Sequence, residues 1–145
     1  MTRRWLLDVN VLIALVDPRH VFHDRAHDWF VTSAEEGWAT CPMTENGLLR
    51  IVGSPKYPGS PGSPAAVAPS LRSLRAVGDW AFWPDDVSLM DDALVDADAL
   101  LTSEQLTDSY LLALAVRNGG RLATFDSRLS ARAVTGGDTG LVLIP

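Results

Sequence analysis

Residues 106–126, LTDSYLLALAVRNGGRLATFD, decide the fold: they predict a helix, a glycine stop, a strand and a carboxylate where that strand ends. The helix is indicated by apolar residues at three-to-four spacing, which are Leu111, Leu112, Ala115 and Val116. Asn118, Gly119 and Gly120 end it, because glycine takes the left-handed conformation that a helix C-cap needs. Residues 121–125 follow as a short, largely apolar strand, and Asp126 stands just past it. A helix feeding directly into a buried strand is typical of an α/β protein.

The rest of the chain repeats this alternation. Strands are expected at 4–9, 38–41, 80–83, 121–125 and 141–144. Helices are expected at 10–16, 21–36, 65–77 and 127–134, and more weakly at 88–101. Two further helices are expected, one that opens at residue 42 with Thr44 as N-cap and one that follows a capping box at 102–105. The turn-rich loop 53–64, GSPKYPGSPGSP, is expected at the rim of a site rather than as a domain linker. Alternating strands and helices predict a parallel sheet covered on both faces, and 145 residues predict one domain over 1–145.

Composition narrows the possible functions. A single cysteine, Cys41, excludes an internal disulfide and indicates a reducing compartment, so we expect a cytoplasmic protein. The apolar run near the N-terminus is interrupted by Asp8 and Asn10, and no cleavage site follows it. The net charge of −6 argues against a simple electrostatic nucleic-acid binder, although cations bound to some of the acids would change that balance.

Four carboxylates are expected at one edge of the sheet. Asp8, Glu45 and Asp126 each follow a predicted strand, and Asp108 stands near the start of a helix on the same face as Leu112. A carboxylate on a buried helix face is costly unless it is paired, protonated or bound to a cation. Hard oxygen ligands suit Mg²⁺ or Mn²⁺, and such ions catalyse phosphodiester hydrolysis. The alternative is that these acids are helix caps and exposed turn residues. This explains any one of them but is less expected for all four together, because perturbed acids gather at functional sites.

These motifs also carry a resemblance to a known family. LLDVNVLIAL at 6–15 and PMTENGLLRIV at 42–52 supply the first two acids, and residues 106–126 supply the last two. In order, spacing and flanks the chain resembles PIN domains, and more narrowly the VapC-type toxins of bacterial toxin–antitoxin pairs. The resemblance runs from residue 4 to 144. It implies a three-layer α/β/α fold with a central parallel sheet of about five strands.

The resemblance also implies an activity. Such proteins are Mg²⁺- or Mn²⁺-dependent endoribonucleases that hydrolyse cellular RNA, with tRNA or rRNA as expected substrates. They are commonly homodimers, and a cognate VapB-type antitoxin covers the site. The implied catalytic residues are Asp8, Glu45, Asp108 and Asp126, with Asp8, Asp108 and Asp126 holding the metal. Asn10 and Thr124 are expected to orient the carboxylates, and RNA contacts are expected from Arg50, Arg117, Arg121, Arg128 and Tyr57.

Other interpretations stay open beside this one. Haloacid-dehalogenase-like phosphatases and phosphorelay receivers also place acids after strands, but both need a lysine near the phosphate. The only lysine, Lys56, lies in the 53–64 loop. A PIN-like scaffold that binds RNA or a partner without cutting is the non-catalytic alternative. His20, His23 and His27 share one helix face and suit a zinc site, but capping of a helix start is favoured, with one of them near the RNA path.

Overall fold

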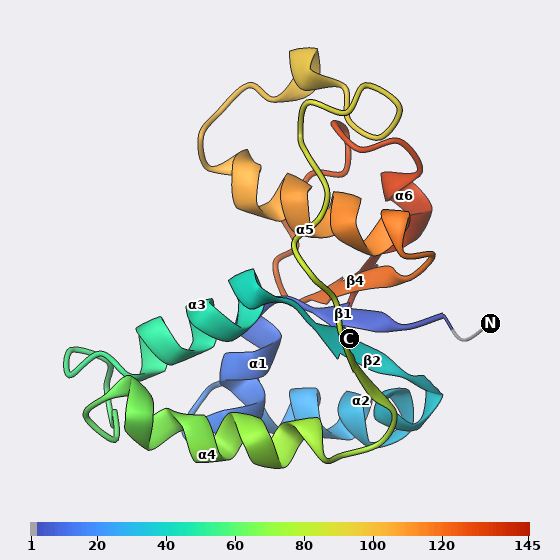
Figure 1. Ribbon diagram of the computed structural model, residues 1–145. Helices are drawn as coiled ribbons and strands as arrows, with labels where there is room; N and C mark the ends of the chain where they lie inside the picture. Colours follow the sequence, from blue (N-terminus) through green and yellow to red (C-terminus); the bar gives the residue numbers. More distant parts are fainter. Residues whose placement is uncertain (1–2) are drawn as a thin grey trace.

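A five-stranded parallel sheet lies at the centre of the computed structural model, which describes residues 3–145 (Figure 1). The strand order is β3-β2-β1-β4-β5, and all four neighbouring pairs are parallel. The strands are β1 Trp5–Leu7, β2 Trp38–Thr40, β3 Trp80–Phe82, β4 Arg121–Thr124 and β5 Leu141–Leu143. The predicted α/β fold is confirmed, and every strand ends at the same edge of the sheet.

Helices cover both faces of this sheet (Figure 1). One face carries α1 Val9–Val16, α2 His23–Glu36, α3 Pro42–Val52 and α4 Pro64–Arg75, and the other carries α5 Gln105–Arg117 and the short α6 Gly137–Gly140. Neighbouring residues of one strand enter different cores. Leu6 packs with α5, whereas Leu7 packs with α1, and both are fully buried. This explains why the strands read as continuous apolar runs.

Local chemistry fixes where the central helices begin and end. Asp8 has an extended backbone and its carboxylate accepts a hydrogen bond from the Val9 N–H, so it is the N-cap of α1. The C-terminus of α5 is followed by Gly119 with φ 70°. Gly120 comes next, and a Cβ there would lie 2.5 Å from the Arg4 carbonyl oxygen. Only glycine therefore lets the chain pass this closely from α5 into β4.

Two predicted helices are wrong. Residues 88–101 form turns and the 3₁₀ helix η1 Ala97–Ala99, and residues 127–134 form turns. In both segments side chains take the backbone N–H groups two residues ahead: Asp91 accepts from Ala93, and Asp126 accepts from Arg128. Aspartate and serine compete with helix formation in this way, a signal that apolar spacing does not contain.

Smaller differences concern helix starts. Cys41, not Thr44, is the N-cap of α3, and the Thr44 hydroxyl accepts a hydrogen bond from the Cys41 N–H instead. The capping box at 102–105 is half formed, because Gln105 accepts from the Thr102 N–H while the helix begins at Gln105 itself. Within residues 3–145, no helix is both long and apolar enough to cross a membrane.

Candidate active site

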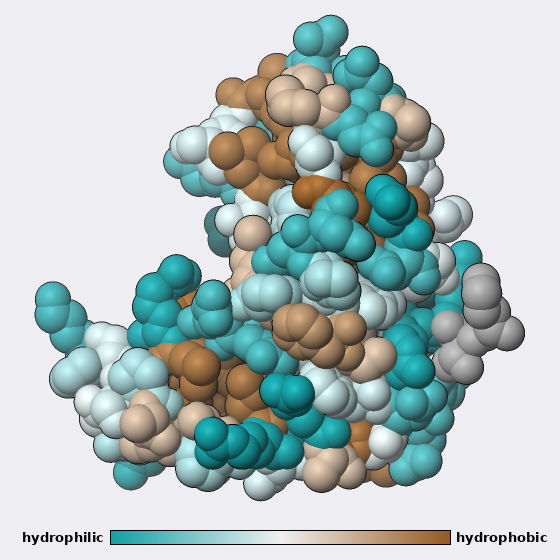
Figure 2. Space-filling view, viewed as in Figure 1, coloured by the Kyte–Doolittle hydropathy of each residue, from teal (hydrophilic) through white to brown (hydrophobic). Residues whose placement is uncertain are grey.

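Three aspartates lie where the strands end. Asp8 follows β1, Asp126 lies two residues beyond β4, and Asp108 stands in the first turn of α5. Figure 2 shows the surface hollowed between the part of the molecule that carries α5 and the part that carries α3 and α4. One cleft of about 440 Å³ is lined by Asp108, Asp126, Gln105 and Arg128 among others. The edge of the sheet thus presents carboxylates to an open cleft.

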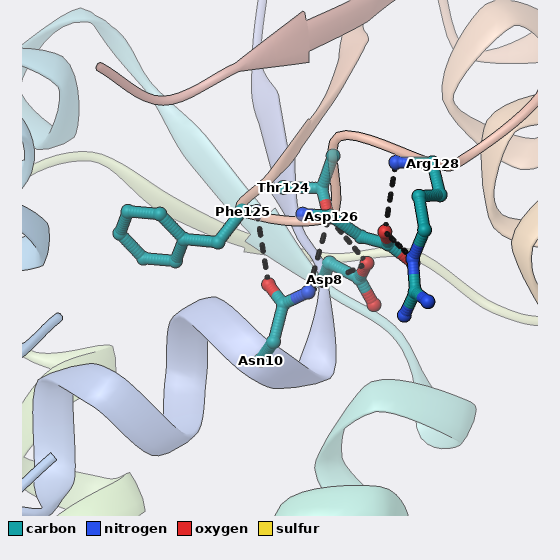
Figure 3. A network of polar contacts seen from close by, with 6 residues as sticks. All are labelled: Asp8, Asn10, Thr124, Phe125, Asp126 and Arg128. Atoms are coloured by element: carbon teal, nitrogen blue, oxygen red, sulfur yellow. Dashed lines mark hydrogen bonds and ion pairs between the residues drawn. The ribbon is translucent and has the colours of Figure 1, made fainter. Parts of the chain in front are cut away.

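Asp8 is held in place by its neighbours (Figure 3). It is only 7% exposed, and one carboxylate oxygen accepts from the Val9 N–H at 2.7 Å. The other oxygen accepts from the Thr124 hydroxyl at 2.8 Å. The Asn10 amide also donates to this second oxygen, at 3.5 Å. Since a carboxylate oxygen has two acceptor positions, the oxygen that accepts from Val9 keeps capacity for a further partner.

Thr124 connects the strand ends, and its side chain is fully buried. Its hydroxyl donates to Asp8 and accepts from the Asn10 amide and from the Asp126 N–H, both at 3.1 Å. The Asn10 carbonyl oxygen in turn accepts from the Phe125 N–H at 3.2 Å (Figure 3). Asn10 and Thr124, which the resemblance assigned to orienting the carboxylates, therefore stand in contact with Asp8.

The pKa values of Asp8 and Asp108 are both raised. Burial is the main cause of the raised pKa of Asp8, and the charge of Asp126 adds to it, although hydrogen bonds from Thr124 and Val9 act in the opposite direction. Burial raises the pKa of Asp108 to about 6, with further contributions from Asp8 and Asp126. Within residues 3–145 the one ion pair to this trio joins Asp126 to Arg128 at 3.7 Å, and the Arg128 side chain is 93% exposed. Such a pair contributes little, so negative charge accumulates here.

This donor set fits a hard divalent cation. All its ligand atoms are carboxylate oxygens, and an added positive charge would relieve both the desolvation and the mutual repulsion that raise these pKa values. Among the described residues, no three His, Cys, Asp or Glu side chains form a group that could hold an ion directly. An ion that keeps several waters and takes one or two carboxylates directly, as Mg²⁺ does, suits this spacing.

Glu45, the fourth predicted acid, is engaged elsewhere. It lies in the first turn of α3, and its carboxylate accepts from the Thr40 hydroxyl at 2.6 Å and pairs with Arg75 at 3.7 Å. Trp80 completes this network: its indole N–H donates to the Thr40 hydroxyl, and the Arg75 guanidinium lies 3.9 Å from its ring centroid. Glu45 is not among the charges that raise the pKa of Asp8 or Asp108. Asp8, Asp108 and Asp126 are therefore linked through their charges, whereas Glu45 is held by Thr40 and Arg75.

Sequence reasoning missed the partners of Glu45. Thr40 is the last residue of β2, as Thr124 is of β4, so a threonine ending a strand ahead of an acid is a signal that was available. Arg75 reaches Glu45 from the far end of α4, and no spacing in the sequence predicts that contact.

The predicted RNA-contacting residues are divided between the two edges of the sheet. Arg128 borders the acids, and Arg50 lines a hollow with Val9 and Thr107. Arg117 and Arg121 lie at the opposite edge, at the end of α5 and the start of β4. The guanidinium of Arg121 lies 5.3 Å from the Trp5 ring centroid.

Tyr57, the aromatic residue among the expected RNA contacts, is not freely exposed. It is half-buried, and its hydroxyl donates to the Asp17 carboxylate.

The three histidines do not converge on one point. His23 and His27 donate ring N–H groups to the carbonyls of Ala14 and Leu15, at 2.7 and 2.9 Å. They therefore cap the end of α1 rather than the start of α2. His20 points elsewhere, and lines a hollow with Asn10 and Asp126.

Comparison with known proteins agrees with this geometry. The PIN domain family matches residues 5–134. The chain is 44% identical over 133 residues to ribonuclease VapC44 of Mycobacterium tuberculosis, covering 92% of this chain and 93% of that protein. It is 47% identical over 122 residues to ribonuclease VapC38 of the same organism, covering 84% of each, and 44% identical over 131 residues to ribonuclease VapC39, covering 90% and 94%. The chain therefore belongs to the PIN-domain family, among the VapC ribonucleases.

Proposed function

We propose that this chain is the toxin of a toxin–antitoxin pair, an endoribonuclease that uses Mg²⁺ or Mn²⁺ to hydrolyse phosphodiester bonds of tRNA or rRNA in the cytoplasm. The observation that carries the proposal is the trio Asp8, Asp108 and Asp126: the pKa values of Asp8 and Asp108 are raised by burial and by neighbouring carboxylates of the trio, and Asp108 and Asp126 line a cleft. Perturbed acids that gather in a cleft mark functional sites. We assign the whole chain, residues 1–145, to one such domain.

Each aspartate has its own part in this proposal. Asp8 is the fixed ligand, because Thr124 and the Val9 N–H hold both of its oxygens. Asp108 carries no hydrogen bond from a neighbour that would lower its pKa, so it is the acid most open to a cation. Asp126 is positioned through its own N–H, which Thr124 accepts. A bound divalent cation supplies the charge that activates a water and offsets the charge of the leaving oxygen.

Glu45 is proposed to act beside this trio rather than as a ligand. The Thr40 hydroxyl and Arg75 hold its carboxylate in one orientation. From the first turn of α3 it is suited to position the attacking water, in the role that the resemblance assigns to the second acid.

Two partners belong to the proposal. A VapB-type antitoxin would inhibit the enzyme by covering the acids, and a basic side chain from it would neutralise the trio in place of a cation. We further propose a homodimer. Analytical ultracentrifugation of the purified chain alone, and with the product of a neighbouring small open reading frame, tests both.

The activity is tested by incubating purified protein with total cellular RNA in Mg²⁺, in Mn²⁺ and in EDTA. Asp108→Ala removes a proposed ligand, and Asp24→Ala is the matched control, since Asp24 is exposed and also stands in the first turn of a helix. We expect discrete products that need the metal, persist in Asp24→Ala and vanish in Asp108→Ala. No cleavage by the wild type freed of any antitoxin would favour a scaffold that binds RNA or a partner without cutting. Equal cleavage by Asp108→Ala would contradict the assignment of the acids as the source of the activity.

A further inference from the structure

A second hollow adjoins the acids on the side of the α1–α2 loop. It has a volume of about 370 Å³ and is lined by Asn10, His20, Phe22, Phe125, Asp126, Ser127 and Arg128. We infer that this hollow, which we call the aromatic pocket, receives the unpaired base of the RNA nucleotide next to the cleaved phosphate. This inference rests on the proposed ribonuclease function and adds to it the group that selects the nucleotide.

The walls of the aromatic pocket suit a flat ring. Phe22 and Phe125 are stacked, with centroids 4.7 Å apart and planes at 26°. The Arg25 guanidinium lies 4.6 Å from the Phe22 centroid and 5.3 Å from that of Phe125. Arg25 therefore makes cation–π contacts with both rings and adds a positive charge to the aromatic pocket. Unpaired bases are recognised on such aromatic faces, and a nearby guanidinium strengthens the stacking.

His20 adds a hydrogen-bond donor to this pocket. Its Nδ1 accepts the Phe22 N–H at 3.0 Å, so in the neutral ring the proton lies on Nε2. Its ring also packs against Phe22, with centroids 5.8 Å apart. Nε2–H can therefore donate to a carbonyl oxygen or ring nitrogen on the edge of a base that rests on Phe22. Stacking from one residue and an edge contact from the next is how single-stranded RNA is read.

The loop that carries His20 and Phe22 is held before RNA arrives. His23 and His27 tie the start of α2 to the last carbonyls of α1, and the Asp17 carboxylate accepts from the Arg19 N–H. A pocket on a fixed loop loses little conformational freedom on binding, which favours recognition of one base over another.

Position connects the aromatic pocket to the reaction. It shares Asp126 and Arg128 with the cleft that holds Asp108, so a nucleotide spanning both would place its phosphate near the acids. The two other hollows near the acids, as defined by the described residues, have no aromatic side chain in their walls. Arg128 stands at the shared rim, where it can meet the phosphate of the same nucleotide.

The test uses single-stranded RNA oligonucleotides that contain a mapped cleavage site, either intact or with one base removed beside the cut. Phe22→Leu keeps an apolar side chain for packing but removes the aromatic face, and His20→Ala removes the donor. The control is Val21→Ala, because Val21 lies between them and is 83% exposed. Thermal unfolding checks that each variant is folded. If Phe22→Leu does not fold, the result for His20→Ala alone tests the pocket.

We expect removal of one flanking base to lower kcat/KM of the wild type by about 5- to 150-fold. On intact RNA, Phe22→Leu and His20→Ala should lower kcat/KM by a similar factor. On abasic RNA they should cleave nearly as well as the wild type does, because the base that these side chains would contact is already absent. Val21→Ala should behave as the wild type. Wild-type cleavage of intact RNA tests the proposed function by itself.

The pocket assignment is overturned if both variants cleave intact RNA at the wild-type rate. It is also overturned if each variant lowers kcat/KM on abasic RNA by the same factor as on intact RNA, because the two effects would then be independent. If the wild type cleaves nothing, binding of single-stranded RNA oligonucleotides is measured by fluorescence anisotropy instead. Equal affinity of wild type and variants for intact RNA then overturns the assignment.

Discussion

Replacing Asp108 by asparagine is expected to stabilise the protein when no metal is bound. Burial, together with Asp8 and Asp126, raises the pKa of Asp108 to about 6 in the folded chain, whereas an unfolded aspartate titrates near ~3.9. The folded state therefore holds the proton more tightly than the unfolded state does. Stability is greatest where both states are protonated, falls as the pH rises from about 4 to about 6, and stays low above that.

The size of the effect follows from this shift. About two pKa units would correspond to about 3 kcal/mol for a fully buried group. Asp108 is partly exposed, so solvent screening reduces this to about 1.5 kcal/mol. Asparagine also loses the favourable charge in the first turn of α5, worth about 0.5 kcal/mol. The expected net gain is about 1 kcal/mol at pH 8, and less at pH 5.

Urea unfolding in EDTA at pH 5 and pH 8 measures this gain. The matched control is Asp24→Asn, which also removes a carboxylate from the first turn of a helix but lies on the surface, away from the acids. It should cost about 0.5 kcal/mol at both pH values. The reasoning is refuted if Asp108→Asn is destabilised like the control, or if its gain is the same at both pH values.

Three further predictions follow from the same contacts. Thr124→Val keeps the buried volume but removes the hydroxyl that serves Asp8, Asn10 and Asp126, so urea unfolding should show a loss of about 2–4 kcal/mol, and a loss below about 1 would contradict the network. Millimolar Mg²⁺ or Mn²⁺ should raise the melting temperature by about 2–4 °C at pH 7.5. The increase should be much smaller at pH 5, because Asp108, with its pKa of about 6, is then protonated. An increase that does not depend on pH would count against the metal site. Gly120→Ala should destabilise the fold by about 1–3 kcal/mol, since its Cβ would meet the Arg4 carbonyl; an unchanged melting temperature would show that the strand can move away.

Much of this fold could be predicted from local patterns in the sequence. The five strands are short runs of apolar residues, because both faces of the sheet are covered, and each was expected within a residue or two of its position. The segments that were wrong, 88–101 and 127–134, are those where aspartate and serine side chains bind nearby N–H groups. Apolar spacing cannot weigh that competition, since it depends on the geometry of each turn.

The site divides in the same way. Asp8 and Asp126 could be foreseen because a parallel sheet brings strand ends to one edge, and Asp108 because it shares a helix face with buried Leu112. The engagement of Glu45 with Arg75 could not, since it depends on how α4 packs against α3. The positions of the arginines could not be foreseen either. Arg117 and Arg121 flank Gly119 and Gly120 in the sequence, and the turn that these glycines form lies at the edge of the sheet opposite the acids. Proximity in sequence to a site residue does not specify the edge of the sheet.

The central claim is that Asp8, Asp108 and Asp126 hold one divalent cation, in part directly and in part through its waters. The measurement that tests it most directly is titration of the purified, metal-free chain with Mn²⁺, followed by the electron paramagnetic resonance signal of the free ion. The account predicts saturable binding by the wild type and by Asp24→Asn, and weaker binding when any of the three aspartates is replaced by asparagine. Absence of saturable binding, or binding that all three replacements leave unchanged, would contradict it.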